Sequence, residues 1–279
     1  MPSPVREAAE HAGVAVLTPA RTSDPALLAA VRDLAPDACP VVAYGSLIPP
    51  SLLAVPAWGW VNLHFSLLPA WRGAAPVQRA IMAGDQLSGA TTFVLDQGLD
   101  TGPVLGTLTE TIHPTDTAGD LLARLSKAGA QLLVATMDAL EQGGLQPVPQ
   151  LVDGVSHAPK LSTADARIDW RRPGYVVDRH IRGCTPTPGA WTTFRGARLK
   201  VLPVRPDTPT RRSSATEAAT DAAPGRVCVV DQAVVVRTGR ADVRLGQVQP
   251  AGKPAMDAVA WARGARLHSD ETLGANADD

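Results

Sequence analysis

The stretch Val61-Asn62-Leu63-His64-Phe65-Ser66-Leu67-Leu68-Pro69 decides how the first half of the chain folds. Residues 60–64 predict a short strand that begins after Gly59. Successive strand residues point to opposite faces, so the side chains of Asn62 and His64 share one face. Open α/β sheets bind ligands at the carboxyl ends of their strands. The stretch therefore predicts a sheet strand and, at its end, a place for a site.

Short apolar strands alternate with helical segments on both sides of this stretch. Ser23 or Asp24 can cap a helix that has Pro25 in its first turn, and Gly84-Asp85 can end a later helix. The predicted strands are 14–17, 39–44, 60–64, 90–95 and 104–109, and the predicted helices are 4–13, 25–35, 75–83 and 116–140. Strands that alternate with helices indicate parallel βαβ units, so we expect an α/β domain.

The second half of the chain has a different pattern. From Gln146 the chain loses its periodicity and gains prolines, which predicts a linker. A short strand at 168–170 and a helix at 173–181 are expected next. Many short strands at close spacing follow them and favour a small β-barrel.

These patterns divide the chain into three parts. We expect a first domain at 1–145, a linker at 146–163 and a second domain at 164–279. Within the second domain, residues 206–224 are of low complexity and predict a disordered surface loop, and residues 275–279 predict a frayed end.

The composition is that of a globular protein of 279 residues, of which 45% are hydrophobic and 19% are charged. This length allows two domains. No apolar run reaches the ~20 residues of a membrane span, and the Pro-interrupted N-terminus is not a signal peptide. Cys39, Cys184 and Cys228 form no CxxC pair, so neither a disulfide framework nor a zinc site is indicated. We expect a cytoplasmic protein with no membrane contact.

The net charge of −1 hides an asymmetry between the two halves. Residues 1–159 carry 7 Lys and Arg against 14 Asp and Glu, and residues 160–279 carry 19 against 13. A basic C-terminal half suggests a polyanionic partner, although a solvated, arginine-rich surface gives the same balance.

Three polar side chains form a candidate site. Asn62 and His64 lie at a strand end, and Asp100 lies in the Gly-flanked loop 98–102. No GxSxG surrounds Ser66, and an Asn, a His and an Asp fit direct attack by a substrate amine on a carbonyl carbon. Asn62 would donate to the oxyanion, His64 would donate a second bond or move a proton, and Asp100 would orient His64 or relay the proton. A histidine at a strand end can equally be structural.

Several segments resemble the methionyl-tRNA formyltransferase family. The runs 62–69 and 71–78 are similar to the family's signature, and Gly98-Leu99-Asp100-Thr101-Gly102 is similar to its second motif. Segments that resemble its C-terminal portion are 166–170, 181–182 with 186–188, and 243–247. The resemblance implies a Rossmann-like formyltransferase domain followed by an OB-like barrel. It also implies formyl transfer from 10-formyltetrahydrofolate to the amino group of methionyl-initiator tRNA.

The resemblance implies roles for individual residues as well. The family's catalytic trio falls on Asn62, His64 and Asp100. The folate-contacting run falls on Ser66, Leu67, Leu68 and Pro69. The residues that would flank the pterin are Tyr44, Gly45, Ser46, Leu47, Ile48 and the backbone from Asp96 to Asp100. The linker and barrel would hold the tRNA, with phosphate contacts at Arg167, Arg182, Arg198, Lys200 and Lys253. The resemblance implies no metal, and we expect a monomer.

The start of the chain departs from the family pattern. Family members have a strand, a Gly-Thr-Pro turn, a helix, a second strand and a basic loop before the segment that here reads Pro2-Ser3-Pro4-Val5. We expect either a longer natural protein or a truncated form of weak activity. Two other activities stay open. One is a sugar-nucleotide or glycinamide ribonucleotide formyltransferase with the same trio, which needs no tRNA platform. The other is a non-catalytic form that binds folate or RNA.

Overall fold

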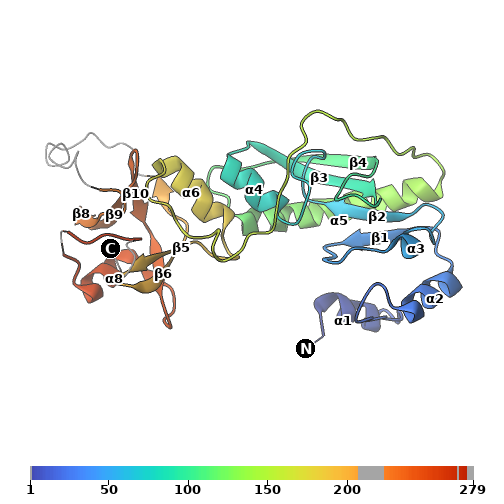
Figure 1. Cartoon of the computed structure of the whole chain (residues 1–279), viewed down its shortest axis with the longest axis horizontal. Helices are drawn as coiled ribbons and strands as arrows, with labels where there is room; N and C mark the ends of the chain where they lie inside the picture. The colour runs from blue at the N-terminus through green and yellow to red at the C-terminus, as the bar shows by residue number, and fades with distance from the viewer. Residues whose placement is uncertain (1, 207–222, 269, 275–279) are drawn as a thin grey trace.

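The computed structural model describes residues 2–206, 223–268 and 270–274. Within these ranges an α/β half and a half built of antiparallel strands lie at opposite ends of an elongated molecule (Figure 1). The fold class is therefore the predicted one. The low-complexity loop predicted at 206–224 lies almost wholly outside the described residues, and the frayed end predicted at 275–279 lies wholly outside them.

A mixed sheet of four strands forms the centre of the α/β half: β1 (Cys39–Val42), β2 (Trp60–His64), β3 (Leu87–Val94) and β4 (Val104–Thr111). They lie in the order β1-β2-β3-β4. β1 and β2 run parallel, with Val41 opposite Asn62, whereas β2–β3 and β3–β4 are antiparallel. The prediction of parallel units is right for β1–β2 and wrong for β2–β3, although a helix lies between those two strands in the sequence. The short loop from β3 to β4 is a connection that only antiparallel neighbours allow.

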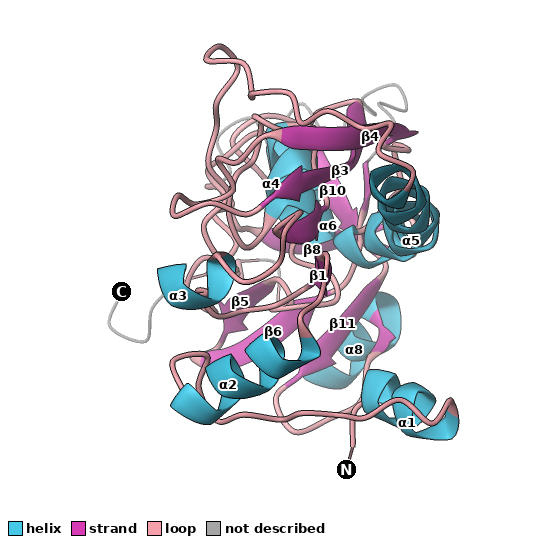
Figure 2. Cartoon of the chain, turned by 90° about the vertical axis from the view of Figure 1, so that its right-hand side faces the viewer, coloured by secondary structure: helices cyan, strands magenta, loops and turns pink. Residues whose placement is uncertain are grey.

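Helix α5 (Ala118–Glu141) packs against this sheet (Figure 2). It begins with a capping box, in which Thr117 and Asp120 each accept from the other's backbone N–H. Leu133 of α5 lies in one buried cluster with Val61 and Leu63 of β2. Burial of each such side chain contributes roughly 1.5–3 kcal/mol, so this contact fixes which face of β2 turns inward.

The N-terminal segment packs more loosely. It contains three helices: α1 (Pro4–His11), α2 (Pro25–Leu34) and α3 (Pro50–Leu53). Asp24 caps α2 by accepting from the Ala26 N–H, as predicted. Residues 14–17 form no strand, so that prediction is wrong, and Val14 and Leu17 are more than half exposed. An apolar run of four residues needs a pairing edge to become a strand, and among the described residues these four pair with none.

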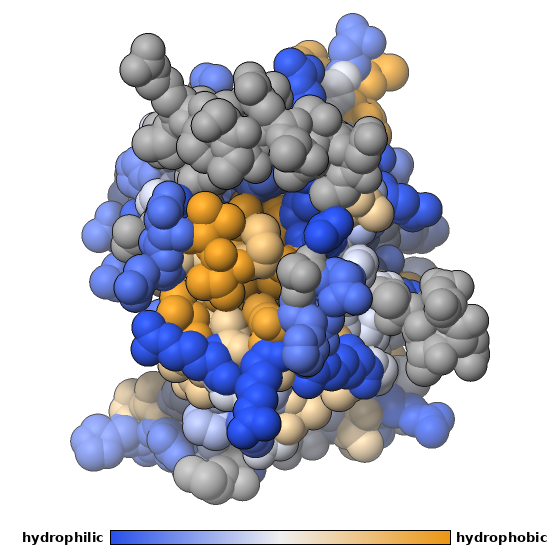
Figure 3. Space-filling view, turned by 90° about the vertical axis from the view of Figure 1, so that its left-hand side faces the viewer, coloured by the Kyte–Doolittle hydropathy of each residue, from blue (hydrophilic) through white to orange (hydrophobic). Residues whose placement is uncertain are grey.

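The C-terminal half consists of two antiparallel sheets, in the orders β7-β10-β9-β8 and β12-β11-β6-β5. Their strands are β5 (Trp191–Phe194), β6 (Ala197–Val201), β7 (Arg205–Pro206), β8 (Val227–Val230), β9 (Ala233–Arg237), β10 (Asp242–Leu245), β11 (Gln247–Pro250) and β12 (Met256–Asp257). Helix α8 (Ala258–Ala265) follows them. Figure 3, which faces this half, shows an apolar area framed by hydrophilic residues.

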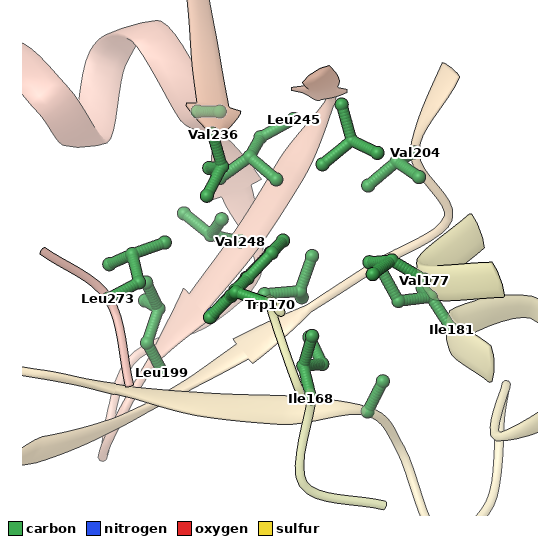
Figure 4. Close-up of a cluster of buried hydrophobic side chains, with 14 of the residues drawn as sticks. Ile168, Trp170, Val177, Ile181, Leu199, Val204, Val236, Leu245, Val248 and Leu273 are labelled. Atoms are coloured by element: carbon green, nitrogen blue, oxygen red, sulfur yellow. The ribbon is translucent and has the colours of Figure 1, made fainter. Parts of the chain in front are cut away.

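One apolar core joins the two sheets (Figure 4). Trp170 and Ile168 are buried in it, together with Leu199 of β6 and Val236 of β9. The strand predicted at 168–170 is wrong, because among the described residues the segment's β-pairing is limited to the isolated bridge from Arg167 to Trp191. Its apolar residues reflect burial in the core and not membership of a sheet.

The two halves meet where α6 (Gly174–Gly183) packs against α4 (Pro76–Ala83). Arg182 of α6 is buried there and lies 2.9 Å from the Asp178 carboxylate through its Nε. Its Nη1 also donates to the Asp116 carbonyl at 2.9 Å, just before α5. Among the described residues, no helix is both long enough and apolar enough to cross a membrane.

Candidate active site

Strand β2 presents Asn62 and His64 on the face opposite to α5. His64 is only 6% exposed, and its ring meets the edge of Phe93 with 6.4 Å between the ring centroids. Asn62 is half-buried, and its side chain makes no hydrogen bond to another described residue. The strand end therefore places an available amide beside a buried imidazole.

The neighbours of His64 determine which ring nitrogen carries the proton. Nε2 lies 2.9 Å from the Trp71 carbonyl oxygen, and a carbonyl can only accept, so Nε2–H donates. The other nitrogen, Nδ1, faces Oδ2 of Asp100 at 3.7 Å, which is too long for a hydrogen bond. Burial lowers the pKa of His64 below its usual value, although Asp100 and the Trp71 carbonyl oppose this. The imidazole is therefore neutral near pH 7, with the lone pair of Nδ1 directed at Asp100.

Asp100 is held in its place by backbone groups. Its Oδ2 accepts from the Gly73 N–H at 2.7 Å, and its backbone has a φ of +54°. A non-glycine residue in this region is uncommon and costs of order 1–3 kcal/mol, so surrounding contacts must maintain it. Gly73 itself has a φ of +123°, and a Cβ there would lie 2.7 Å from the Ala158 carbonyl oxygen. Only glycine lets this N–H reach the carboxylate.

This arrangement can take up a proton. The Nδ1 lone pair and the Asp100 carboxylate face each other, so a proton that arrives between them is stabilised by both groups. The sequence predicted that Asp100 would orient His64 or relay a proton. The Trp71 carbonyl also orients the ring through Nε2, and the roles predicted for Asp100 stay predictions.

The run from Ser66 to Pro69 forms the turn after β2. Ser66 is 1% exposed, and its hydroxyl donates to the Ala70 carbonyl at 2.6 Å. Thr91 of β3 donates to the Ser66 carbonyl and accepts from the Leu68 N–H. The Ser66 side chain therefore shapes the turn. The folate contacts predicted for Ser66, Leu67, Leu68 and Pro69 stay predictions.

Residues 43–48 follow β1, which runs parallel to β2, so they lie at the same edge of the sheet as His64. Tyr44 is 51% exposed and Leu47 is 82% exposed. Across the site, the Asp96 carboxylate accepts from the Gly98 N–H at 2.9 Å and from the Thr101 hydroxyl at 2.7 Å. Asp96 thus stabilises the loop that carries Asp100. The pterin contacts predicted for these segments stay predictions.

The predicted linker packs directly against the site. The Ser156 hydroxyl accepts from the Trp71 N–H at 2.8 Å, and the Ser156 carbonyl accepts from the Arg72 N–H at 2.9 Å. The Ala158 N–H donates to the Arg72 carbonyl at 2.7 Å. Sequence reasoning missed these contacts because a segment without periodicity gives no signal for its pairing. Among the residues that the structure describes, no three His, Cys, Asp or Glu side chains gather as a metal site requires.

The predicted phosphate contacts separate into two groups. The guanidinium groups of Arg198 and Arg167 lie over the Trp191 ring, at 4.3 Å and 5.8 Å from its centroid. Lys200 is opposite Trp191 in the strand register and is exposed. Arg182 does not fit the prediction, because it is buried and its guanidinium is bound to Asp178 and the Asp116 carbonyl.

The fifth candidate, Lys253, is exposed in the turn after β11. Trp191 was not among the predicted site residues. The sequence around it, residues 190–194, gives no sign that two arginines stack on the Trp191 ring.

Two family models match the chain. The model described as "Formyl transferase" matches residues 1–137, and the model described as "Formyl transferase, C-terminal domain" matches residues 160–266. The methionyl-tRNA formyltransferase of Streptomyces coelicolor is 57% identical over 272 residues, which is 98% of this chain and 85% of the relative. The methionyl-tRNA formyltransferase of Thermobifida fusca is 55% identical over 98% of this chain and 85% of the relative.

Solved structures share the fold at lower identity. WlaRD, described as a sugar 3N-formyl transferase, aligns with a TM-score of 0.64 at 14% identity over 90% of this chain and 82% of that chain. HypX from Aquifex aeolicus, in complex with tetrahydrofolic acid, aligns with a TM-score of 0.64 at 18% identity over 86% of this chain and 41% of that chain. At these identities the likeness shows the fold alone.

Proposed function

The chain belongs to the methionyl-tRNA formyltransferase family, and we propose that Asn62, His64 and Asp100 carry out its formyl transfer. It is a one-carbon transferase that formylates methionyl-tRNA. One observation carries the assignment of the residues. The neutral, buried His64 faces Asp100 across 3.7 Å without a hydrogen bond, beside an amide that has no partner among the described residues.

Asn62 stabilises the charge that develops on the formyl group. When the amine of the methionyl ester attacks the formyl carbon, a C–N bond forms and one electron pair of the C=O bond moves to the oxygen. The Asn62 amide would donate a hydrogen bond to this oxyanion. Such a donor lowers the activation free energy by about 3 kcal/mol, because it is already in position when the charge appears.

His64 and Asp100 handle the proton of the attacking amine. The proton passes to Nδ1 of His64, and the Asp100 carboxylate stabilises the imidazolium that results. The bond from Nε2 to the Trp71 carbonyl holds the ring during this step. As the tetrahedral intermediate collapses, the bond from the formyl carbon to the donor nitrogen breaks. His64 returns the proton to that leaving nitrogen.

We propose 10-formyltetrahydrofolate as the formyl donor. HypX, which shares the fold, is described in complex with tetrahydrofolic acid, and this supports a folate derivative. The edge of the sheet beside His64 suits a flat heterocycle, because Tyr44 and Leu47 expose apolar surface there. The turn from Ser66 to Pro69 closes the same edge.

We propose that the tRNA phosphates meet the basic face around Trp191, where Arg167, Arg198 and Lys200 lie. The excess of Lys and Arg over Asp and Glu in residues 160–279 supports the placement of the tRNA phosphates at this face. Within the same proposal, the substrate is the initiator tRNA, the enzyme acts as a monomer, and it works in the cytoplasm, where translation begins. Arg182 has no part in phosphate binding.

Formylation of charged tRNA tests the proposal. Purified enzyme is incubated with 10-formyltetrahydrofolate and methionyl-initiator tRNA, and formylmethionyl-tRNA is measured. We expect turnover, with a KM for tRNA that rises steeply with salt as phosphate contacts are screened. Parallel reactions offer a sugar nucleotide amine or glycinamide ribonucleotide as the acceptor. Turnover of those acceptors alone, or folate binding without any turnover, would overturn the proposal.

A further inference from the structure

Gln150, in the predicted linker, forms four hydrogen bonds with the two loops that carry the site. Its Nε2 donates to the carbonyls of Asp100 and Gly102, both at 2.8 Å. Its Oε1 accepts from Arg72, from Nη2 at 2.7 Å and from Nε at 3.1 Å. An amide has two N–H donors and two acceptor lone pairs, so its whole capacity is used. Its orientation is unambiguous, because carbonyls only accept and a guanidinium only donates.

The two ends of this amide reach the two halves of the catalytic pair. Arg72 lies between Trp71, whose carbonyl holds His64, and Gly73, whose N–H holds the Asp100 carboxylate. The other end of the amide binds the carbonyl of Asp100 itself. Gln150 therefore joins the loop that orients the imidazole to the loop that supplies the carboxylate.

Local backbone pairing places Gln150 at this position. Val148 and Val104 exchange both backbone hydrogen bonds, at 2.7 Å and 2.8 Å, as an antiparallel bridge. Two residues further along the linker, the chain is opposite Gly102. The bonds to the Asp100 and Gly102 carbonyls hold a loop whose Asp100 has a φ of +54°. That conformation persists only where surrounding contacts over-determine it.

We propose that Gln150 is a positioning residue for formyl transfer, which fixes the Asp100 carboxylate relative to the His64 imidazole. The inference rests on the proposed function, because it assigns to Gln150 an effect on the reaction of that pair. Gln150 acts through the two loops and needs no contact with either substrate. Its loss should therefore lower kcat and leave the KM for tRNA and for the folate donor nearly unchanged.

Two variants of the whole chain test this. Gln150→Met removes the amide at similar volume, and we expect kcat to fall about tenfold to a hundredfold, the size of effect that a misplaced catalytic group produces. Gln150→Glu keeps the acceptors for Arg72 but has no N–H for the carbonyls of Asp100 and Gly102, so it should not restore kcat. Gln146→Met is the matched control, because Gln146 is exposed on the same segment. Its kcat should equal that of the wild type.

The melting temperature of each variant separates positioning from folding. A fall in kcat in a variant that melts with the wild type supports the proposal. Wild-type kcat in Gln150→Met or in Gln150→Glu overturns it, and so does a loss of activity that appears only as a raised KM. If Gln150→Met melts early, kcat is measured well below its melting temperature, and recovery of the full rate there overturns the proposal. Failure of the proposed function is distinct, because the wild-type enzyme itself would then formylate no tRNA.

Discussion

Within the described part of the chain, the Asp178–Arg182 pair and the His64–Asp100 pair are both largely shielded from solvent, but they differ in how far their hydrogen bonds are satisfied. Asp178 and Arg182 lie 2.9 Å apart on one helix, and Arg182 also donates to the Asp116 carbonyl. His64 and Asp100 lie 3.7 Å apart without a hydrogen bond between them. Burial disfavours the charged form in both places. It raises the pKa of Asp178 against the opposing effect of Arg182, and it lowers the pKa of His64.

The difference indicates that the Asp178–Arg182 pair stabilises the fold and that the His64–Asp100 pair is suited to proton transfer. The Arg182 guanidinium is engaged by groups of its own chain, so the pair joins α6 to the segment before α5 and has nothing to offer a substrate. At the other pair, each partner has a backbone contact of its own: Nε2 of His64 donates to the Trp71 carbonyl, and the Oδ2 of Asp100 that faces Nδ1 also accepts from the Gly73 N–H. The 3.7 Å between Nδ1 and Oδ2 is where the proposed mechanism places the proton of the amine.

The largest effect is expected from breaking the structural pair. Arg182→Met leaves Asp178 buried without its partner, which costs about 3–5 kcal/mol of folding free energy. Urea unfolding should therefore show a much lower midpoint. Arg171→Met is the matched control, because the Arg171–Asp169 pair is exposed, and its midpoint should change far less. Equal shifts in the two variants would contradict the comparison.

The catalytic side of the comparison is tested by rate. Asn62→Ala removes the proposed oxyanion donor, and His64→Ala removes the proton acceptor, so each should lower turnover by about two or more powers of ten. Affinity for tRNA, measured by filter binding, should be preserved. His11→Ala, in the exposed helix α1, serves as the control histidine. Near-normal rates in both site variants would remove the assignment of the trio.

The titration of His64 sharpens the contrast further. Its pKa is lowered by burial, so the imidazole stays neutral until the pH falls below about 6.5, the usual histidine value. The unfolded chain takes up this proton more readily, so the stability that the neutral ring contributes is lost as the pH falls through that range. An NMR titration should place the midpoint of His64 below about 6.5, the usual histidine value. In the Asp100→Asn variant the His64 midpoint should fall further, because the Asp100 carboxylate raises the pKa of His64. An upward shift of the His64 midpoint in that variant would contradict this assignment of causes.

The smallest effect is expected at a charge that belongs to neither pair. Lys200→Ala removes one exposed cation beside Trp191, so tRNA binding should weaken modestly. The salt slope of log K should fall by about 1. Lys127→Ala, exposed on α5, should leave both values as they are. An unchanged slope in the Lys200 variant would exclude it from the phosphate face.

Prediction from the sequence succeeded where the signal was local. The ends of α4 and α2 follow from Pro76, Gly84 and Asp24, because caps and turns depend on neighbours in the chain. Residues 14–17 were predicted as a strand and are not, since a strand also needs a partner that local sequence does not specify. The antiparallel direction of β3 depends in the same way on where the chain returns.

For the candidate site, the sequence by itself determined that an amide and an imidazole share one face of a strand, because the two-residue period of a strand allows nothing else. It also placed Asp100 in a glycine-flanked loop. Only the tertiary structure decided that Asp100 lies 3.7 Å from His64, that Arg182 is buried, and that Gln150 joins the two loops. The contacts from Gly73 to Asp100, from Gln150 to Asp100 and from Arg182 to the Asp116 carbonyl span 27, 50 and 66 residues in sequence, and packing sets them through burial and hydrogen bonding that no local pattern records.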